Sequence, residues 1–220
     1  MKDGKCSQCG PSNKYCMVDG GNAPEFCSTL LYKEALERAD KKYDDPETAK
    51  FALESARQEK SGYADVPGKP GFRMPTKPRI LEIVEFCHRM EYKRIGLAFC
   101  VGLQNEAMKV AKIFESNGLE VVSVACKVGG VDKSRIGVTD EEKLVGSGKE
   151  VMCNPIGQAE VLNDAKTEFN VLLGLCVGHD SLFIKNSEAM CTVLAVKDRL
   201  MGHNPLAAVY NCDSYYKFLK

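Results

Sequence analysis

Short apolar runs alternate with helix-like segments from residue 79 to the end of the chain, and this alternation restricts the possible folds more than any other feature. Four runs are almost continuously apolar: residues 95–101, 119–126, 170–176 and 191–196. Runs of this kind are typical of strands buried on both faces. Helices are expected beside and between them, at residues 79–90, 103–117, 158–166, 180–189 and from 205 onward. The pattern predicts an α/β fold with a doubly wound, mostly parallel sheet of four to five strands.

The first 27 residues have a different character. They are small, polar and rich in cysteine, and they show neither the strand nor the helix period, so apolar burial alone cannot fold them. Two helices are expected next, at residues 29–43 and 46–60. Asp45 as the N-cap and Pro46 as the first helical residue mark the start of the second helix.

Residues 61–78 contain four prolines and three glycines, which predicts a linker or an extended strap and makes this segment the best candidate for a domain boundary. We therefore expect two domains. Residues 1–78 would hold a cysteine-rich metal-binding segment, a pair of helices and the linker. Residues 79–220 would form an α/β domain with cysteines at the carboxyl edge of its sheet.

The composition excludes several classes of protein. The chain has 30 basic and 30 acidic side chains, so it lacks the basic excess that is usual in nucleic-acid binding. No apolar run reaches the roughly 18 residues that span a bilayer, and the start Met-Lys-Asp-Gly-Lys lacks the apolar stretch of a signal peptide. We therefore expect a cytoplasmic protein without a membrane or nucleic-acid partner. In a reducing compartment its eleven cysteines are expected to be metal ligands or reactive thiols rather than disulfides.

Four cysteines near the N-terminus form a local metal-binding pattern. Cys6 and Cys9 make a Cys-x-x-Cys knuckle, and Cys16 and Cys27 follow. A knuckle lets two sulfurs meet one ion, and two further thiolates complete a tetrahedral shell. Zinc is the default ion for such a site, and an iron–sulfur cluster uses the same four ligands. A thioredoxin-like redox pair is the competing interpretation of the first two cysteines, but it leaves the other two unexplained.

Four further cysteines map to one edge of the predicted sheet. Cys100, Cys126 and Cys176 each stand at the last residue of an expected strand, with a glycine two or three positions later. Cys153 comes just before a helix start. Because ligands bind outside the carboxyl ends of parallel strands, we expect these four thiols to share a cofactor site. The alternative for each one is a small hydrophobic residue of the core.

The other cysteines and two histidines complete the set of candidates. We expect Cys87 and Cys191 to lie in the core, whereas the pattern around Cys212 predicts no role. His179 and His203 each follow a glycine after a strand, so both map to the cysteine-bearing edge. His179 could donate a hydrogen bond to a ligand of the metal or move protons for anything bound at Cys176, and a loop-capping imidazole is the alternative for it. With an open iron, both histidines would handle protons beneath a lid formed by residues 127–151.

Two other features belong to the same edge. Asp198 and Arg199 follow the fourth strand and would supply polar or anion-binding contacts, or else form an exposed ion pair. Residues 127–151 make a long connection, with one short helix expected at 139–145, and connections of this length often act as lids or binding loops. Neither a Walker A loop nor a Gly-x-Gly-x-x-Gly fingerprint is present, so nucleotide binding by those routes is unsupported.

Several stretches of the chain resemble a known family. They are residues 98–102, 153–163, 172–183, 197–199 and 202–207, together with the N-terminal cysteines. The family comprises small cysteine-rich proteins, found mainly in anaerobic bacteria and archaea and catalogued as an uncharacterised domain with a predicted metal-binding label. The resemblance implies metal binding and a setting that favours iron–sulfur chemistry. It implies no particular reaction.

The leading hypothesis from these observations is an iron–sulfur protein. Cys100, Cys126, Cys153 and Cys176 would hold a cluster of the [4Fe-4S] type, and the N-terminal cysteines would hold zinc or a second cluster. With four thiolate ligands, electron transfer to a redox partner is the simplest role. With three, one iron would be open to a small sulfur- or oxygen-bearing substrate.

Two other classes of function remain open. The first is a zinc-braced small-molecule-binding or scaffold protein without catalysis, in which the strand cysteines are ordinary thiols. The second is a metal-free thiol enzyme, with Cys100 or Cys176 as nucleophile and His179 as base. The sequence therefore predicts chemistry at its cysteines and leaves enzyme activity undecided.

Overall fold

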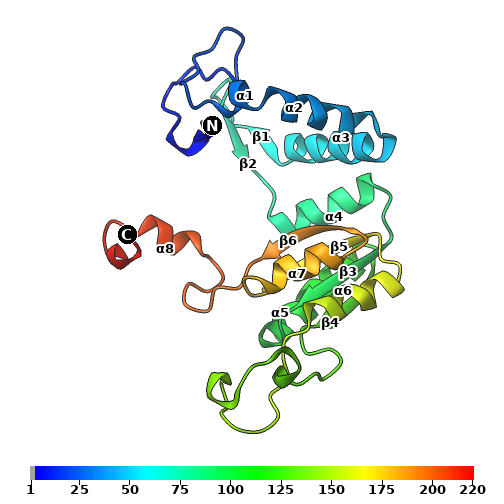
Figure 1. Cartoon of the computed structure of the whole chain (residues 1–220). Coiled ribbons are helices and arrows are strands. Elements are labelled where there is room, and N and C mark those ends of the chain that lie inside the picture. The colour runs from blue at the N-terminus through cyan, green and yellow to red at the C-terminus, as the bar shows by residue number, and fades with distance from the viewer. Residues whose placement is uncertain (1–2) are drawn as a thin grey trace. The chain divides into compact units, whose positions relative to one another are not determined.

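A computed structural model describes residues 3–220 and divides them into two compact units. The first unit ends at Lys60 and the second is Ser61–Lys220. Figure 1 shows the elements of both units in chain order. Within the described residues, no helix has both the length and the apolar character that crossing a membrane requires.

The first unit consists of cysteine-bearing loops followed by helices. The helix expected at residues 29–43 is divided into α1 (Ser28–Leu31), α2 (Lys33–Asp40) and a 3-10 turn, Lys41–Asp44. The division falls at Tyr32, whose ψ of 37° leaves the helical region. The second expected helix is confirmed as α3 (Pro46–Ser61). Its N-cap is also confirmed, because the backbone N–H of Thr48 donates to Asp45 Oδ2 at 2.8 Å.

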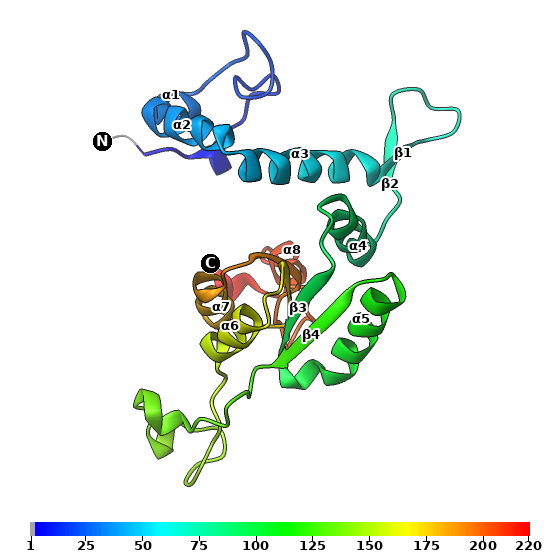
Figure 2. The same cartoon turned by 90° about the vertical axis from the view of Figure 1, so that its right-hand side faces the viewer.

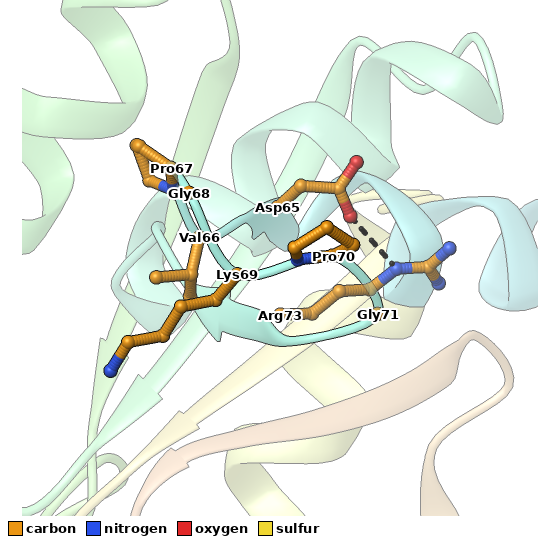
Figure 3. A pocket seen from close by; sticks show the side chains of 8 residues that line it. All are labelled: Asp65, Val66, Pro67, Gly68, Lys69, Pro70, Gly71 and Arg73. Atoms are coloured by element: carbon orange, nitrogen blue, oxygen red, sulfur yellow. Dashed lines mark hydrogen bonds and ion pairs between the residues drawn. The ribbon is translucent and has the colours of Figure 1, made fainter.

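The proline- and glycine-rich segment is a β-hairpin rather than a linker. Strands β1 (Tyr63–Asp65) and β2 (Arg73–Pro75) pair antiparallel, and they belong to the second unit. Figure 3 shows the hairpin tip, which surrounds a shallow hollow of about 780 Å³ beside the Asp65–Arg73 ion pair (3.4 Å). No cysteine or histidine lines this hollow. The compact units thus divide after Lys60, ahead of the boundary expected at residue 78.

The second unit contains a four-stranded parallel sheet, which confirms the predicted fold class. The strands are β3 (Arg94–Phe99), β4 (Glu120–Ala125), β5 (Phe169–Leu173) and β6 (Met190–Ala195). Their order in the sheet is β4-β3-β5-β6. The helices are α4 (Arg79–Arg89), α5 (Gln104–Ser116), α6 (Pro155–Asp164), α7 (His179–Asn186) and α8 (Leu206–Tyr210). Figure 2 shows α5 on one face of the sheet and α6 and α7 on the other.

The core of this unit lies between the sheet and its helices. Strands β3 and β5 are almost completely buried because they occupy the middle of the sheet, which explains their continuous apolar runs. Leu162 of α6 and Phe183 of α7 are fully buried against the sheet. Gly96 in β3 is required by close packing, since a Cβ there would lie 2.0 Å from Asn170 Oδ1.

Candidate thiol centre at the carboxyl edge of the sheet

The strand order places a topological switch point between β3 and β5. The chain leaves β3 through α5 towards β4, and it leaves β5 through α7 towards β6 on the opposite side. Connections that diverge in this way open a crevice at the carboxyl ends of the two strands, where α/β proteins bind ligands. Cys100 follows β3 and Cys176 follows β5. Two predicted site residues therefore flank the position that the fold favours for a ligand.

The strand cysteines lie just beyond the strands rather than at their last residues. Cys100 and Cys126 directly follow β3 and β4, and their backbone N–H groups still bond the neighbouring strands, at 3.0 Å to Leu173 O and 2.9 Å to Phe99 O. The third strand was expected to end at Cys176, but β5 ends three residues earlier, at Leu173. Gly174, with a φ of +67°, turns the chain away before Cys176 is reached.

Cys153 and Cys126 are brought together by the start of α6. Their Sγ atoms lie 3.7 Å apart. The backbone N–H of Asn154 donates to Cys126 O at 2.7 Å, which fixes the two chain segments side by side. The Asn154 side chain caps α6 by accepting from Gly157 N at 2.9 Å and donates from Nδ2 to Val128 O at 3.2 Å. The Cys-Asn-Pro sequence is thus a helix start that presents a thiol to the end of β4.

The pKa values of the two thiols in this pair are shifted in opposite directions. The hydrogen bond to Cys126, aided by the positive charges of Lys127 and His179, lowers the pKa of Cys153 to about 5. The same hydrogen bond, together with burial, raises the pKa of Cys126 far above its ordinary value. In the metal-free pair the shared proton therefore stays on Cys126, the more buried sulfur. The backbone N–H of Val101 approaches the same sulfur at 3.4 Å.

Basic side chains surround the four cysteines, Cys100, Cys126, Cys153 and Cys176, which we call the thiol centre. Arg199 Nη2 donates to Cys176 Sγ at 3.1 Å, and this contact raises the pKa of the guanidinium. Cys100 and Cys153 lie close enough for their charges to act on the same guanidinium. The Lys127 ammonium is held by Val151 O at 2.6 Å. Among the four sulfurs, the positive charges favour a thiolate at Cys153, and the thiolate is the form that binds a metal or attacks an electrophile.

The thiol centre is open on one side. Cys100 and Cys126 are buried, whereas Cys153 and Cys176 are half-buried. Arg199, beside Cys176, is exposed. A ligand or reagent therefore reaches Cys153 and Cys176 more readily than the two buried thiols.

Four thiols are chemically suitable ligands for a metal ion, and the two sulfurs of Cys126 and Cys153 also have a suitable spacing. With bonds of about 2.3 Å to a tetrahedral ion, two thiolate sulfurs lie roughly 3.8 Å apart. The 3.7 Å between Cys126 and Cys153 matches this value. Across residues 3–220, however, no three histidine, cysteine or acidic side chains are grouped closely enough to hold one ion. The remaining two thiols stand near the pair without completing a single-ion site.

The two histidines differ in their surroundings. His179 is the first residue of α7, its backbone N–H donates to Cys176 O at 3.0 Å, and its charge acts on Cys153. His203 has a left-handed backbone (φ 67°), and its Nδ1 accepts the backbone N–H of Asp198 at 3.2 Å. The imidazole of His203 therefore caps its own loop. Proton transfer by either histidine stays a prediction.

The long connection after β4 is a loop whose two ends are joined by contacts with each other. An isolated bridge joins Asp132 to Val151, and an ion pair joins Lys133 to Glu150. The helix expected at residues 139–145 is only a 3-10 turn, Asp140–Glu142. The loop begins and ends at the paired thiols, so its base is part of the thiol centre. Its action as a lid stays a prediction.

The N-terminal cysteines lie on loops of the first unit. Cys9 N donates to Cys6 O at 3.1 Å, which is the tight turn expected of a knuckle. Cys6 Sγ contacts Ser28 Oγ at 3.1 Å, next to Cys27, and this hydrogen bond lowers the pKa of Cys6. Cys16 is exposed. The turn and the Ser28 contact place parts of the predicted site near one another, and metal binding there stays a prediction.

The remaining cysteines lie away from the thiol centre. Cys87 of α4 is fully buried, as expected, and burial raises its pKa to about 12. Cys191, the second residue of β6, is half-buried and packs against the core cluster, and burial raises its pKa as well. Cys212 lies beyond α8 with its sulfur near Asp213.

Gln158, beneath the thiol centre, was not predicted from the sequence. Gln158 of α6 is fully buried and bonds the ends of β3 and β4 through its side-chain amide. Its signal was a polar residue on the apolar stripe of a helix, one position before Ala159 and four before Leu162. Arg199 was expected to supply polar or anion-binding contacts or to form an exposed ion pair, and its polar partner is the thiol of Cys176.

Comparison with known proteins places these residues within a family. The family model described as "Protein of unknown function (DUF1847)" matches residues 27–194, which include the whole thiol centre but only the last of the four N-terminal cysteines. An uncharacterized protein of Methanocaldococcus jannaschii, MJ0455, is 43% identical over 212 residues, covering 96% of this chain and 95% of the relative. The resemblance to an uncharacterised family with archaeal members is confirmed. The chain therefore belongs to the DUF1847 family of proteins of unknown function.

Proposed function

We propose that the thiol centre is a metal–thiolate site and that the chain is an iron–sulfur protein. The observation that carries this proposal is the gathering of four thiols at one edge of the sheet, where Cys126 and Cys153 stand in contact and Arg199 donates to Cys176. Cys100 and Cys176 flank the same switch-point crevice and bring the number of available sulfur ligands to four. Four thiolates are the ligand set of a [4Fe-4S] cluster, the form that we propose. Each thiolate would bind a separate iron, so Cys126 and Cys153 would move apart from the contact that they make in the metal-free protein.

The basic side chains support the proposal through charge balance. Thiolate ligands leave a metal centre with excess negative charge, which burial at a sheet edge makes costly. Arg199 donates directly to one ligand sulfur, and Lys127 lies beside another. The backbone N–H of Val101 adds a hydrogen bond to a third. Such hydrogen bonds to sulfur tune the potential of an iron–sulfur centre.

A bound cluster would supply one-electron transfer. The residues of the chain would then set its access and surroundings: Cys153 and Cys176 lie on the open side, where a redox partner or small substrate can approach. Arg199 stands at the same opening as an exposed cation. We further propose that His179, at the start of α7, exchanges a proton with a ligand there.

The proposal is tested by visible absorption of protein prepared without oxygen. Cys176→Ser and Cys153→Ser should each lose most of the cluster absorption. Cys191→Ser is the matched control, because that cysteine is half-buried in β6 and away from the edge, and it should keep the absorption. Equal absorption in all three variants and the wild type would remove the thiol centre as the cluster site.

A second candidate function rests on the same pair of sulfurs. In the absence of a metal, Cys126 and Cys153 could act as a redox dithiol, with the low pKa of Cys153 favouring attack. The two thiols would form one disulfide and pass two electrons and two protons to a disulfide acceptor, which becomes two thiols. Protein free of metal, with this disulfide formed reversibly, would favour the second candidate.

The N-terminal cysteines are proposed to hold zinc or a second cluster. The turn at Cys6–Gln8 and the contact of Cys6 with Ser28 support a compact site in a segment whose described residues, 3–27, include no buried hydrophobic side chain. Bound metal would then stabilise the loops, since folding of such segments depends on their ion. Loss of ordered structure on chelation, confined to this segment in hydrogen exchange, is the expected result. Unchanged protection would argue against a metal there.

A further inference from the structure

Gln158 is a fully buried polar side chain on the face of α6 that packs against the sheet. Its exposed fraction is 0%, as are those of Ala159 and Leu162 beside it. Burying an amide costs free energy unless its groups find hydrogen-bond partners. The position would suit an apolar residue, so the reason for a glutamine must lie in its contacts.

The amide nitrogen of Gln158 joins the ends of two strands. Nε2 donates to Val124 O at 2.8 Å and to Phe99 O at 3.2 Å. Phe99 directly precedes Cys100, and Val124 stands two residues before Cys126. Because both acceptors are carbonyl oxygens, the orientation of the amide is determined. The side chain therefore ties β3 to β4 immediately beneath two thiols of the centre.

The amide oxygen, in contrast, is left without a partner. Oε1 of Gln158 is the buried side-chain atom for which the described residues offer no hydrogen bond. An unsatisfied buried acceptor lowers stability, so it offsets part of what the two Nε2 hydrogen bonds contribute. The contribution of Gln158 to folding stability is therefore reduced, and its distinctive effect is on the positions of the two strand ends.

Asn154, about one helical turn before Gln158, adds two further hydrogen bonds between the start of α6 and the end of β4. Residues four apart share a helix face, and Asn154 donates to Cys126 O and Val128 O at 2.7 and 3.2 Å. Together with Gln158, the start of α6 thus bonds the carbonyls of three alternate residues along β4 and its continuation. Cys153 immediately precedes this face of the helix.

We infer that Gln158 is a positioning residue for the thiol centre: it holds the ends of β3 and β4 against α6 and so fixes Cys126 opposite Cys153. The inference deepens the proposed function, on which it rests for the identity of the bound metal. The geometry it concerns is that of the metal-free pair and can be measured without a metal. Groups that orient metal ligands in this way typically contribute about 10- to 100-fold to metal affinity.

The test is the equilibrium between the Cys126–Cys153 dithiol and its disulfide in glutathione buffer, with metal removed. Oxidised glutathione takes two electrons and two protons from the pair and becomes two reduced glutathione molecules. Peptide mass spectrometry measures the disulfide fraction at these two positions alone. The equilibrium constant reports how closely the thiols are held, because close positioning favours the intramolecular disulfide.

Gln158→Leu should lower this equilibrium constant about tenfold, with a fall in melting temperature no larger than that of a variant that loses two hydrogen bonds elsewhere on α6. Asn163→Leu is the matched control: it lies at the other end of α6 and also loses two hydrogen bonds, to Asn186 O and from Glu188 N, both at 2.9 Å. The equilibrium constant of the control variant should stay within about twofold of the wild-type value. If Gln158→Leu fails to fold, Gln158→Met, which fills a similar volume, replaces it, and the same tenfold fall in the equilibrium constant is expected.

An equilibrium constant for the Gln158 variant within twofold of the wild type would overturn the inference. An equal fall in the Asn163 control would also overturn it, because the effect would then be general to α6. A parallel cadmium titration of wild-type protein, followed by thiolate absorption, tests the proposed function separately. Failure to bind cadmium would count against the metal site, whereas the positioning role of Gln158 would still be decided by the glutathione equilibrium.

Discussion

Replacing Asn154 by alanine should destabilise the second unit by about 2 kcal/mol. The side chain makes two hydrogen bonds that the variant loses: Oδ1 accepts from Gly157 N at 2.9 Å, and Nδ2 donates to Val128 O at 3.2 Å. Loss of an N-cap costs about 1 kcal/mol, and loss of a second, half-buried hydrogen bond about 1 kcal/mol more. The backbone bond from Asn154 to Cys126 is retained, so the fold itself should survive.

Asn154→Asp separates the two contributions. Aspartate can still accept from Gly157 N and cap the helix, and its charge suits a helix N-terminus. It has no N–H to donate to Val128 O. We therefore expect a loss of about 1 kcal/mol, which is the part that belongs to the bond with Val128. The order of stability should be wild type, aspartate variant, alanine variant.

Urea denaturation followed by circular dichroism measures these changes, and thermal unfolding provides a second reading. A loss of about 2 kcal/mol corresponds to a fall of roughly 4–8 °C in melting temperature for a unit of this size. Asn117→Ala, at the exposed end of α5, removes one hydrogen bond to Ile113 O and should change stability by less than about 0.5 kcal/mol. If Asn154→Ala were no more disruptive than this control, the role assigned to the start of α6 would be refuted.

Two further predictions concern the pair of thiols and the core. In metal-free protein, Cys153 should react with iodoacetamide faster than any other cysteine at pH 6, and its rate should stay nearly flat up to pH 8, because a pKa of about 5 leaves it as thiolate throughout that range; a tenfold rise per pH unit in the peptide-mapped rate would contradict the assignment. Gly96→Ala should cost about 2 kcal/mol or more, since the new Cβ would overlap Asn170 Oδ1 and Leu162 Cδ1 in the core. An unchanged urea midpoint would show that β3 and α6 pack less tightly than described.

The sheet could be predicted from the sequence because its signals are local. A continuous apolar run marks a buried strand wherever it occurs, and a parallel sheet brings the carboxyl ends of such runs to one edge. The cysteines that follow β3, β4 and β5 were therefore found without knowing the strand order. The start of α6 could also be predicted, because Asn154 is an N-cap residue and Pro155 favours the first position of a helix.

Features that depend on distant contacts could not be predicted in this way. The proximity of Cys126 to Cys153 depends on a backbone bond across a 25-residue loop and on Gln158, whose partners lie 34 and 59 residues away. The hairpin at β1 and β2 was missed because prolines and glycines mark a linker and a turn alike. The helix expected at residues 29–43 is divided at Tyr32, a residue with no helix-breaking signal of its own.

The proposed function requires that the sheet edge binds an iron–sulfur centre through its own thiols. The decisive experiment is the iron, zinc and acid-labile sulfide content per chain of protein purified without oxygen, measured for the wild type and for a variant with serine at Cys6, Cys9, Cys16 and Cys27. We expect the variant to keep about four irons and four sulfides per chain, the content of one [4Fe-4S] cluster. A variant that has lost all iron and sulfide would place the cluster at the N-terminal cysteines and refute its assignment to the sheet edge.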